Sequence, residues 1–464
     1  MISILILVVF VIGYCAIVFE HSIKIDKAAS ALITGVACWV LLVLGFHAVP
    51  AHMTDYFSAL SSFESQTGAT SFTLHDYFDH RLLHHLQEIA SILFFLIGAM
   101  TIVELMDSHH AFKVITDRIA TTNKVKLMWI LAILTFFLSA ALDNLTTCIV
   151  MISLCRKLIS DQKTRWFFAG LIIIAANAGG AWSPIGDVTT TMLWIGGQAT
   201  TVPLIFELFM CSMVCMVVPL IILSFIMKGY VDRPHENEEE NTSTTPRERA
   251  LVFMMGVGGL LFVPIFKTVT HLPPFMGMML SLGILWVATE IIHSRKIYEE
   301  KSNYSVLNAL RKIDMPSVLF FLGILLAVAA LGEAGQLLTL ATVLEENLHN
   351  IYAINIAIGA LSAIIDNVPL VAASMNMYPI AAAGTTDPWL SQFVQDGPFW
   401  HFLAYTAGTG GSMLIIGSAA GVAVMGLEKI DFMWYLKKVS IWALIGYLAG
   451  AGFYILEMTL MHRV

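Results

Sequence analysis

The chain has 464 residues, of which 58% are hydrophobic and only 12% are charged, and its mean hydropathy is +0.79. This composition is too apolar for a soluble globular protein, and apolar stretches of about 20 residues, the length that one membrane crossing needs, recur along the chain. The net charge of −8 lies largely in hydrophilic segments such as residues 235–240, so it does not indicate a nucleic-acid partner.

Hydropathy predicts ten membrane-spanning helices. In chain order they cover residues 2–19, 28–46, 86–106, 167–194, 203–227, 250–267, 274–293, 316–334, 399–426 and 438–459. The first lacks the positively charged start and the small-residue cleavage site of a signal peptide, so we interpret it as a membrane helix.

Two further apolar segments, 127–154 and 351–377, are too long for one helix. Each is interrupted midway by an Asp-Asn pair, which is costly inside a membrane helix. We therefore predict a re-entrant helical hairpin at each place. Two amphipathic stretches, 108–121 and 334–347, are too polar to span, and we expect in-plane helices there.

The distribution of basic residues supports the hairpins. With the N-terminus outside, 22 of the 25 Lys and Arg residues fall in predicted cytoplasmic loops, and only Arg81, Lys267 and Arg463 remain outside. Treating either hairpin as an ordinary span would move several basic loops to the wrong face. This orientation places both termini on the outer face of the membrane.

The two halves of the chain resemble one another at three places in the same order. Leu93-Phe-Phe-Leu96 recurs as Leu319-Phe-Phe-Leu322, Ser139-Ala-Ala-Leu-Asp-Asn144 as Ser362-Ala-Ile-Ile-Asp-Asn367, and Ala178-Gly-Gly with Pro184-Ile-Gly186 as Thr409-Gly-Gly with Ile415-Ile-Gly417. Five spans per half is an odd number, so the repeats are predicted to be inverted. Transporters built this way hold their substrate near the bilayer midplane.

The predicted fold class is thus an all-α membrane protein with two inverted repeats. Each repeat has about five transmembrane helices, a re-entrant hairpin and a broken helix. The predicted domains are residues 1–227, a cytoplasmic acidic linker at 228–249, and residues 250–464. The broken helices are 167–194 and 399–426, because glycines and Pro184 fall inside an apolar run in the first, and glycines do so in the second.

Intramembrane carboxylates are costly and suggest a functional site. Asp143, Asn144 and Thr146 lie where the first hairpin must break, and free backbone carbonyls there would complete an oxygen-rich cation site. A tip held only by Asp and Asn caps is the structural alternative. Sodium is a hard ion that favours oxygen ligands.

The first broken helix adds Asn177 and Asp187 near its gap, with Thr189 and Thr190 just after it. These threonine hydroxyls either ligate an ion or satisfy the helix backbone. In the second half, Asp366 and Asn367 mirror the first hairpin tip. The second broken helix lacks a carboxylate, so the expected site is acidic and asymmetric.

Further candidates are weaker. Glu88, Asp107 and Glu333 are secondary candidates, although Asp107 and Glu333 lie near helix ends where they can simply face water. His80 and His84 have a metal-ligand spacing, which we interpret as a hydrated or interfacial helix. The six cysteines have neither zinc nor redox spacing, and no cofactor is expected.

These motifs resemble the NhaD-type sodium/proton antiporters of the ion transporter superfamily over nearly the whole chain. The most specific stretches are Ala141–Thr147, Asn177–Thr191, Ile365–Leu370 and Gly408–Gly421. The resemblance implies exchange of sodium or lithium for protons across a bacterial inner membrane, pH and sodium homeostasis, and a homodimer. It implies functional roles for Glu88, Asp143, Asn144, Asn177, Asp187, Thr189, Thr190, Ser362, Asn367, Ser412 and Ser418.

Competition between a cation and a proton for the same carboxylates would couple the two flows, with Na⁺ expected at Asp143, Asn144, Asn177 and Asp187. A dicarboxylate, citrate or arsenite carrier of the same superfamily is the nearest alternative, although the midplane aspartates would repel an anion. An intramembrane aspartyl protease fits poorly, because Pro184 replaces the first glycine of its Gly-x-Gly-Asp signature. We therefore expect a transporter and not an enzyme.

Overall fold

The computed structural model describes residues 2–18, 20–45, 74–116, 119, 121–233, 244–294, 304–364 and 366–460. Nearly all regular structure in these residues is α-helical, as the sequence predicts. Residues 47–73 of the external segment and residues 234–243 of the linker lie outside the described residues. What the sequence predicts for those parts therefore stays a prediction.

The described chain divides into two compact units, and each draws segments from both halves of the sequence. Unit 1 contains Met1–Leu93, Asp314–Asn350 and Val368–Pro379, and unit 2 contains Phe94–Ile313, Ile351–Asn367 and Ile380–Val464. Compact units and sequence repeats are thus different divisions of this chain. The predicted inverted orientation of the two halves stays a prediction.

Unit 1 is built from helices that approach closely through glycine. Its helices are α1 (Ile2–Val18), α2 (Glu20–Ile23), α3 (Lys27–Gly45), the first part of α5 (Leu74–Ser108), α16 (Met315–Glu333), α17 (Gln336–Leu348) and most of α19 (Asn367–Met377). A Cβ at Gly35 of α3 would lie 2.5 Å from the Gly323 carbonyl oxygen of α16. Small residues let these two backbones pack directly against each other.

Unit 2 contains most of the other helices. They are the rest of α5, α6 (Lys113–Thr116), α7 (Lys124–Leu142), α8 (Asn144–Leu158), α9 (Gln162–Ala181), α10 (Val188–Ile195), α11 (Thr201–Ile226), α12 (Pro246–Thr270), α13 (Pro274–Ile292), α15 (Val306–Lys312), α18 (Ile351–Leu361), η2 (Leu390–Phe393), α20 (Pro398–Gly410), α21 (Ala419–Glu428), α22 (Phe432–Lys438) and α23 (Ser440–Leu460).

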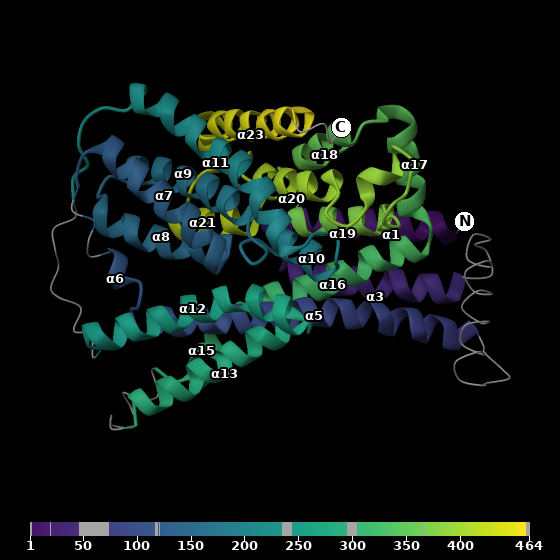
Figure 1. Cartoon of the computed structure of the whole chain (residues 1–464), viewed down its shortest axis with the longest axis horizontal. Helices are drawn as coiled ribbons and strands as arrows, with labels where there is room; N and C mark the ends of the chain where they lie inside the picture. The colour runs from purple at the N-terminus through teal and green to yellow at the C-terminus, as the bar shows by residue number, and fades with distance from the viewer. Residues whose placement is uncertain are drawn as a thin grey trace. The chain divides into compact units, whose positions relative to one another are not determined.

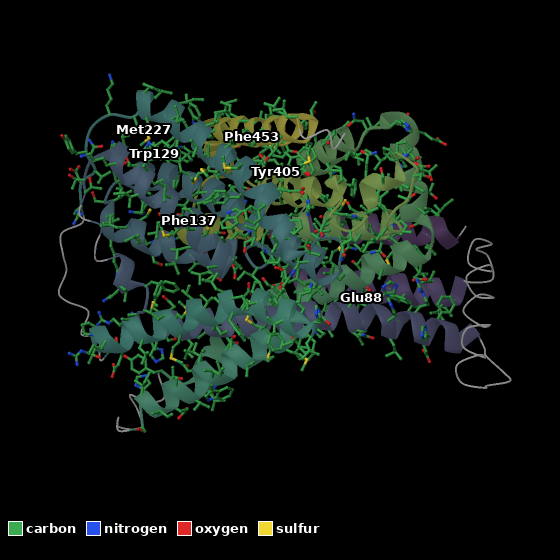
Figure 2. The ribbon with its side chains drawn as sticks, in the orientation of Figure 1. Glu88, Trp129, Phe137, Met227, Tyr405 and Phe453 are labelled. Carbon is green, nitrogen blue, oxygen red and sulfur yellow. The ribbon has the colours of Figure 1, made fainter. Side chains whose placement is uncertain are left out.

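Within unit 2, α7, α8 and α9 lie side by side, and α11 packs along α23 (Figure 1). The indole Nε1 of Trp129 on α7 donates to the Ser224 hydroxyl of α11 over 2.9 Å, and the Tyr405 hydroxyl of α20 donates to the Tyr447 carbonyl of α23 over 2.8 Å (Figure 2). Buried aromatic polar groups thus find partners on neighbouring helices.

Eight helices in the described residues are long and apolar enough to cross a membrane. Seven of them match predicted spans, and the eighth is α7, the first arm of the predicted hairpin at 127–154. The predicted span 2–19 is seen as the shorter apolar helix α1. The predicted spans 167–194 and 399–426 are interrupted, as α9 followed by α10 and as α20 followed by α21.

The two expected in-plane stretches differ. Residues 336–348 form the helix α17, but after α5 ends at Ser108 the chain makes turns and then only the one-turn helix α6. The predicted in-plane position of either stretch is a statement about a bilayer and stays a prediction.

Loops of unit 2 that were predicted on the cytoplasmic side contact one another. The Val231 amide donates to the Thr122 carbonyl over 2.8 Å, and the Ser160 amide donates to the Asp232 carbonyl over 2.9 Å. Glu428, at the end of α21, pairs with Arg156 in the last turn of α8 and with Arg165 in the first turn of α9. These contacts join four loops that the distribution of basic residues assigns to one face.

Two loops assigned to the opposite face also contact each other. The Asp396 amide donates to the Gln198 carbonyl over 2.9 Å, and the Gln395 side chain donates to the Gly197 carbonyl over 2.7 Å. The grouping of these loops agrees with the predicted topology of unit 2. Which of the two faces is cytoplasmic remains a prediction.

Candidate functional site

The first hairpin breaks at Asp143. This residue separates α7 from α8 with φ 97° and ψ 159°, a backbone conformation that L-residues rarely adopt. Its carboxylate caps α8, because Oδ1 accepts the Thr146 amide hydrogen at 2.7 Å and Oδ2 accepts the Thr146 hydroxyl at 2.9 Å. Asp143 therefore does hold the tip, as the structural alternative requires, while each carboxylate oxygen keeps a further lone pair for a cation.

The first broken helix opens at Trp182, and α10 starts only after Asp187. Asp187 caps α10 and is 2% exposed. Its Oδ1 accepts the Thr189 amide hydrogen at 3.3 Å, and its Oδ2 accepts the Asn367 side-chain amide at 3.3 Å. A buried carboxylate from the first broken helix thus contacts the amide of the second Asp-Asn pair.

Asn177 is the centre of a second group of polar contacts. It is fully buried, and its Oδ1 accepts the Asn144 side-chain amide at 3.0 Å. Its own Nδ2 donates to the Ser412 hydroxyl at 2.9 Å and to the Ser418 hydroxyl at 3.2 Å. One side chain therefore connects the first hairpin tip with the gap of the second broken helix.

Asp143 and Asp187 form no ion pair with a basic side chain among the residues that the structure describes. Asp143 and Asp366 lie close enough to Asp187 to act on it electrostatically. Within the described ranges, no lysine, arginine or histidine forms an ion pair with Asp143 or Asp187. Burying a carboxylate without a counter-charge is expensive, so this site favours a bound cation or a proton.

The threonines after Asp187 add oxygen atoms without assigned partners. The Thr189 and Thr190 hydroxyls are buried and have no hydrogen-bond acceptor or donor among the described residues. The Thr191 hydroxyl, in contrast, donates to the Pro184 carbonyl over 3.0 Å. Of the two readings of these threonines, backbone satisfaction therefore applies to Thr191, whereas Thr189 and Thr190 remain available as ligands.

The two halves build their gaps with matching contacts. The Ser139 hydroxyl donates to the Ala176 carbonyl over 2.6 Å, and the Ser362 hydroxyl donates to the Ala407 carbonyl over 2.7 Å. These serines and alanines occupy equivalent places in the sequence repeat. Ser362 thus connects a hairpin to a broken helix by a hydrogen bond to a backbone carbonyl, which is a structural contact.

Glycines make equivalent close approaches in both gaps. A Cβ at Gly180 would lie 2.4 Å from the Gly186 carbonyl oxygen, and a Cβ at Gly411 would lie 2.8 Å from the Gly417 carbonyl oxygen. No larger side chain fits where each chain folds back on itself. The glycine pattern that predicted unwinding therefore has a steric cause.

Comparison with known proteins agrees with this arrangement. A family model described as a citrate transporter matches residues 7–394. Sodium/proton antiporter 1 of Arabidopsis thaliana is 45% identical over 96% of this chain and 71% of its own length. The Na⁺/H⁺ antiporter NhaD of Vibrio cholerae is 27% identical over 98% of this chain and 91% of its own length. The chain belongs to the NhaD-type sodium/proton antiporter family.

The structure places the predicted site residues of this chain in different groups. One group of unit 2 is linked by hydrogen bonds or electrostatically, and it comprises Asp143, Asn144, Thr146, Asn177, Asp187, Thr189, Asp366, Asn367, Ser412 and Ser418. Asp107, at the end of α5, is exposed, so of its two readings the water-facing one holds.

Glu88 and Glu333 belong to unit 1. Glu333 is 7% exposed, and its Oε1 accepts hydrogen bonds from Arg81 and lies 2.8 Å from His85 Nε2. Glu88 (Figure 2) is largely exposed and lies 3.8 Å from His85 Nδ1. Glu333 is therefore a buried ion-pair residue and does not face water. Glu88 is its more exposed neighbour across His85.

Ligand atoms of His84, His85 and Glu88 lie within 4.8 Å of one another. This group is not the pair His80 and His84, whose spacing we interpreted as part of a hydrated or interfacial helix. The side chains of His84 and Glu88 are 53% and 64% exposed, which fits the hydrated helix that the sequence suggested.

Sequence reasoning omitted two features of unit 2. Gly408 of α20 faces the site, because a Cβ there would lie 3.2 Å from Asp187 Oδ2; its alignment with Asn177 in the repeat is the signal that could have revealed it. Glu207 and His401 are ionisable residues inside apolar helices that form an ion pair at 2.6 Å. Their position alone should have marked them.

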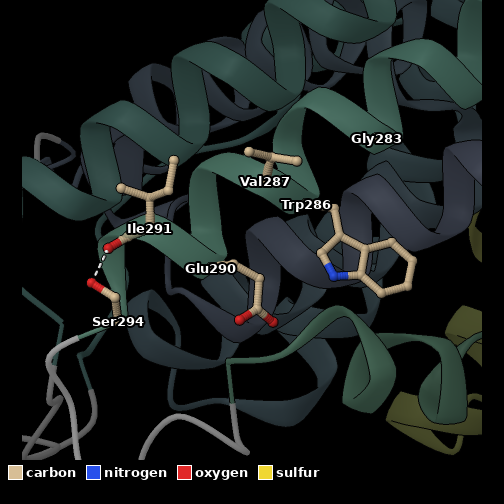
Figure 3. Close-up of a pocket in the computed structure, with 6 residues that line it drawn as sticks. All are labelled: Gly283, Trp286, Val287, Glu290, Ile291 and Ser294. Carbon is tan, nitrogen blue, oxygen red and sulfur yellow. Dashed lines mark hydrogen bonds between the residues drawn. The ribbon is translucent and has the colours of Figure 1, made fainter.

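A pocket of about 640 Å³ lies elsewhere, on the surface of α13 (Figure 3). It is lined by Gly283, Trp286, Val287, Glu290, Ile291 and Ser294. None of these residues belongs to a motif that the two halves share. The ion site is thus a set of buried polar contacts and not this surface pocket.

Proposed function

We propose that this chain exchanges Na⁺ for H⁺ across the membrane, using Asp187 and Asp143 as the shared binding groups. The observation that supports this most directly is the burial of Asp187, at 2% exposure, with no basic partner among the described residues. Such a carboxylate is stable when a cation or a proton neutralises it. Exchange follows because both cannot occupy it at once.

Each polar residue then has a distinct role. Asp187, Asp143 and the Thr189 and Thr190 hydroxyls offer oxygen ligands of the kind that hard cations prefer. Asn177 also organises the site, because its oxygen and its amide hydrogens contact Asn144, Ser412 and Ser418. Its Oδ1 keeps a second lone pair for the Na⁺ contact that the sequence predicts.

The second hairpin tip contributes through Asn367, which donates to Asp187 Oδ2. A proton on that carboxyl oxygen competes with this donor, whereas a cation between the carboxylate oxygens does not. Asn367 therefore favours the deprotonated, cation-binding form of Asp187. Asp366, beside it, adds negative charge near the same point.

Several finer features also belong to this proposal. Li⁺ replaces Na⁺ as a substrate, since both are hard monovalent cations. The chain lies in a bacterial inner membrane as a homodimer with both termini in the periplasm, and it serves pH and sodium homeostasis. Transport needs no catalytic step and no cofactor.

The rival substrate is citrate, which the description of the matching family model names, or a dicarboxylate. The site disfavours an anion because Asp143, Asp187 and Asp366 concentrate negative charge there. In the described part of unit 2, neither Asp143 nor Asp187 forms an ion pair with a basic side chain. Arsenite and citrate carriers are therefore the less favoured members of the superfamily as models for this chain.

The test uses purified protein in proteoliposomes that carry a pH gradient and a pH-sensitive dye. Na⁺, Li⁺, K⁺ and citrate are added in turn to wild type, Asp143→Asn, Asp187→Asn and the control Glu346→Gln, which changes an exposed carboxylate of α17. We expect Na⁺ and Li⁺ to dissipate the gradient in wild type and in the control, and neither aspartate variant to respond.

A response to citrate without a response to any cation would replace the proposed substrate. A response to Na⁺ that survives in both aspartate variants would leave the activity but remove the proposed site. Loss of the response in Glu346→Gln would show that the assay detects damage to the fold and not to the site.

A further inference from the structure

A second group of ionisable residues in unit 2 lies apart from the contacts described above. His401, on α20, is fully buried. Its Nδ1 lies 2.6 Å from Glu207 Oε2 of α11, and its Nε2 lies 3.4 Å from Asp396 Oδ1 of the segment before α20. The imidazole thus makes one hydrogen bond, to Glu207, and its buried Nε2 lies near the Asp396 carboxylate without a hydrogen-bond partner among the described residues.

The geometry selects a charge state. Both carboxylate oxygens of Asp396 accept hydrogen bonds from Thr200, at 2.6 Å from its amide and at 2.7 Å from its hydroxyl, so Asp396 is held as an anion. A neutral imidazole that donates from Nδ1 to Glu207 would point a lone pair at this anion. Protonation of Nε2 removes that repulsion and leaves one net negative charge on the three side chains.

A metal ion does not fit the same residues. The two ring nitrogens of His401 point in different directions, toward Glu207 and toward Asp396. One ion cannot contact both carboxylates and also bind a single histidine nitrogen at the usual distance of about 2.0–2.1 Å. The ligand that this arrangement accommodates is a proton.

Glu207 acts electrostatically on Tyr454 of α23, as do Tyr352 of α18, Glu457 of α23 and Cys211 of α11. None of these described side chains is basic. The Tyr454 hydroxyl donates to the Pro398 carbonyl, over 3.2 Å, at the start of α20. His401 is therefore the group whose charge changes near neutral pH in this surrounding.

The position of the group connects it to the ion site. Asp396 accepts a hydrogen bond from Thr200, which directly precedes α11. Thr200 follows the C-terminal end of α10, and Asp187 caps the N-terminal end of α10. His401 itself lies on α20, whose opposite end carries Gly408 beside Asp187. The three side chains thus join the start of α20 to the start of α11, which follows the end of α10 by a few residues.

We propose that Glu207, Asp396 and His401 form a second proton-binding site, which joins the start of α20 to the start of α11 while His401 is protonated and releases them when the proton leaves. The site binds H⁺ only and is separate from the carboxylates that exchange Na⁺. Asp396, Glu207 and His401 are positioning residues for the exchange, because none of them contacts the ion site.

The direct test is amide hydrogen exchange of the purified protein in nanodiscs, followed from about pH 6 to pH 9 and corrected for intrinsic exchange rates. Two backbone amides serve as reporters. The Thr200 amide donates to Asp396 Oδ1, and the Asp396 amide donates to the Gln198 carbonyl. In wild type we expect their protection to fall by about tenfold as pH rises, roughly the value of one hydrogen bond.

His401→Gln should show low protection at every pH, and Glu207→Gln should move the wild-type transition to lower pH because one stabilising carboxylate is gone. The control His271→Asn removes an exposed histidine at a left-handed position that Asn tolerates, and should match wild type. Protection in wild type that does not change with pH, or a transition that persists unchanged in His401→Gln, overturns the proposal.

Antiport measured against pH in proteoliposomes supplies a second readout. We expect His401→Gln to keep Na⁺-dependent exchange while losing one step of the wild-type pH profile. An unchanged profile in His401→Gln contradicts the link between this site and transport. The amide hydrogen-exchange experiment does not depend on transport. A wild type without antiport would therefore refute the proposed function, and amide hydrogen exchange would still decide whether the proton site exists.

Discussion

The replacement Asn177→Ala tests whether the polar centre of unit 2 organises the ion site. The change removes three buried hydrogen bonds, to Asn144, Ser412 and Ser418. At about 1 kcal/mol for each bond the total is about 3 kcal/mol. If these bonds hold the site in its cation-binding form, the half-saturating Na⁺ concentration should rise by up to about 100-fold.

The assay is Na⁺-dependent dissipation of a pH gradient in proteoliposomes, with the Na⁺ concentration varied at fixed pH. The matched control is Asn355→Ala, which removes a fully buried asparagine of the same unit whose Nδ2 donates to the Phe399 carbonyl over 3.2 Å. Both variants should melt at a lower temperature than wild type. Only Asn177→Ala should shift the Na⁺ dependence.

The reasoning fails if the two variants lose activity equally with no change in half-saturating Na⁺. In that case the contacts of Asn177 stabilise the fold alone. It also fails if Asn177→Ala binds Na⁺ more tightly, because the serine and asparagine partners would then ligate better when they are released.

Further predictions concern packing, ion pairs and pH. Gly410→Ala should reduce the folded yield because its Cβ would lie 2.1 Å from a backbone oxygen. Gly452→Ala should be tolerated, because no atom lies within 4 Å of a Cβ there. Gel filtration in detergent measures the folded yield of both variants. Glu428→Gln should lower stability by about 2 kcal/mol in thermal melts, since its carboxylate is buried and both arginine partners lose their counter-charge. Burial raises the pKa of Asp396, but hydrogen bonds from histidine and Thr200 outweigh it and hold this pKa below the usual value. The lowered pKa of Asp396 stabilises the fold above the pKa of this residue in the unfolded chain, and the stabilisation is lost as pH falls. Thr200→Val should therefore make the melting temperature begin to fall at a higher pH than in wild type.

Local sequence chemistry determined the places where helices begin, break and end. Asp143 interrupts a long apolar run and caps the helix that follows it. The glycines around Gly180 allow a close backbone approach that no larger residue permits. These outcomes depend on neighbouring residues alone, so composition and spacing were sufficient to predict two of the breaks and most of the spanning helices.

The identities of the polar partners required the tertiary structure. Asn177 was predicted as a ligand from its place in the first broken helix, but its contacts with Ser412 and Ser418, which come from the other half of the chain, were not predicted. Glu333 looked equivalent to Asp107 by repeat position, but only Glu333 is buried against a basic side chain.

His401 and Glu207 lie 194 positions apart and show no shared motif, so their pairing could not be read from spacing. The sequence by itself determined where backbone groups must leave the helix, because capping and steric limits act over a few residues. Only the folded chain decided which buried charges meet and which stay without a counter-ion, because that depends on packing between distant helices.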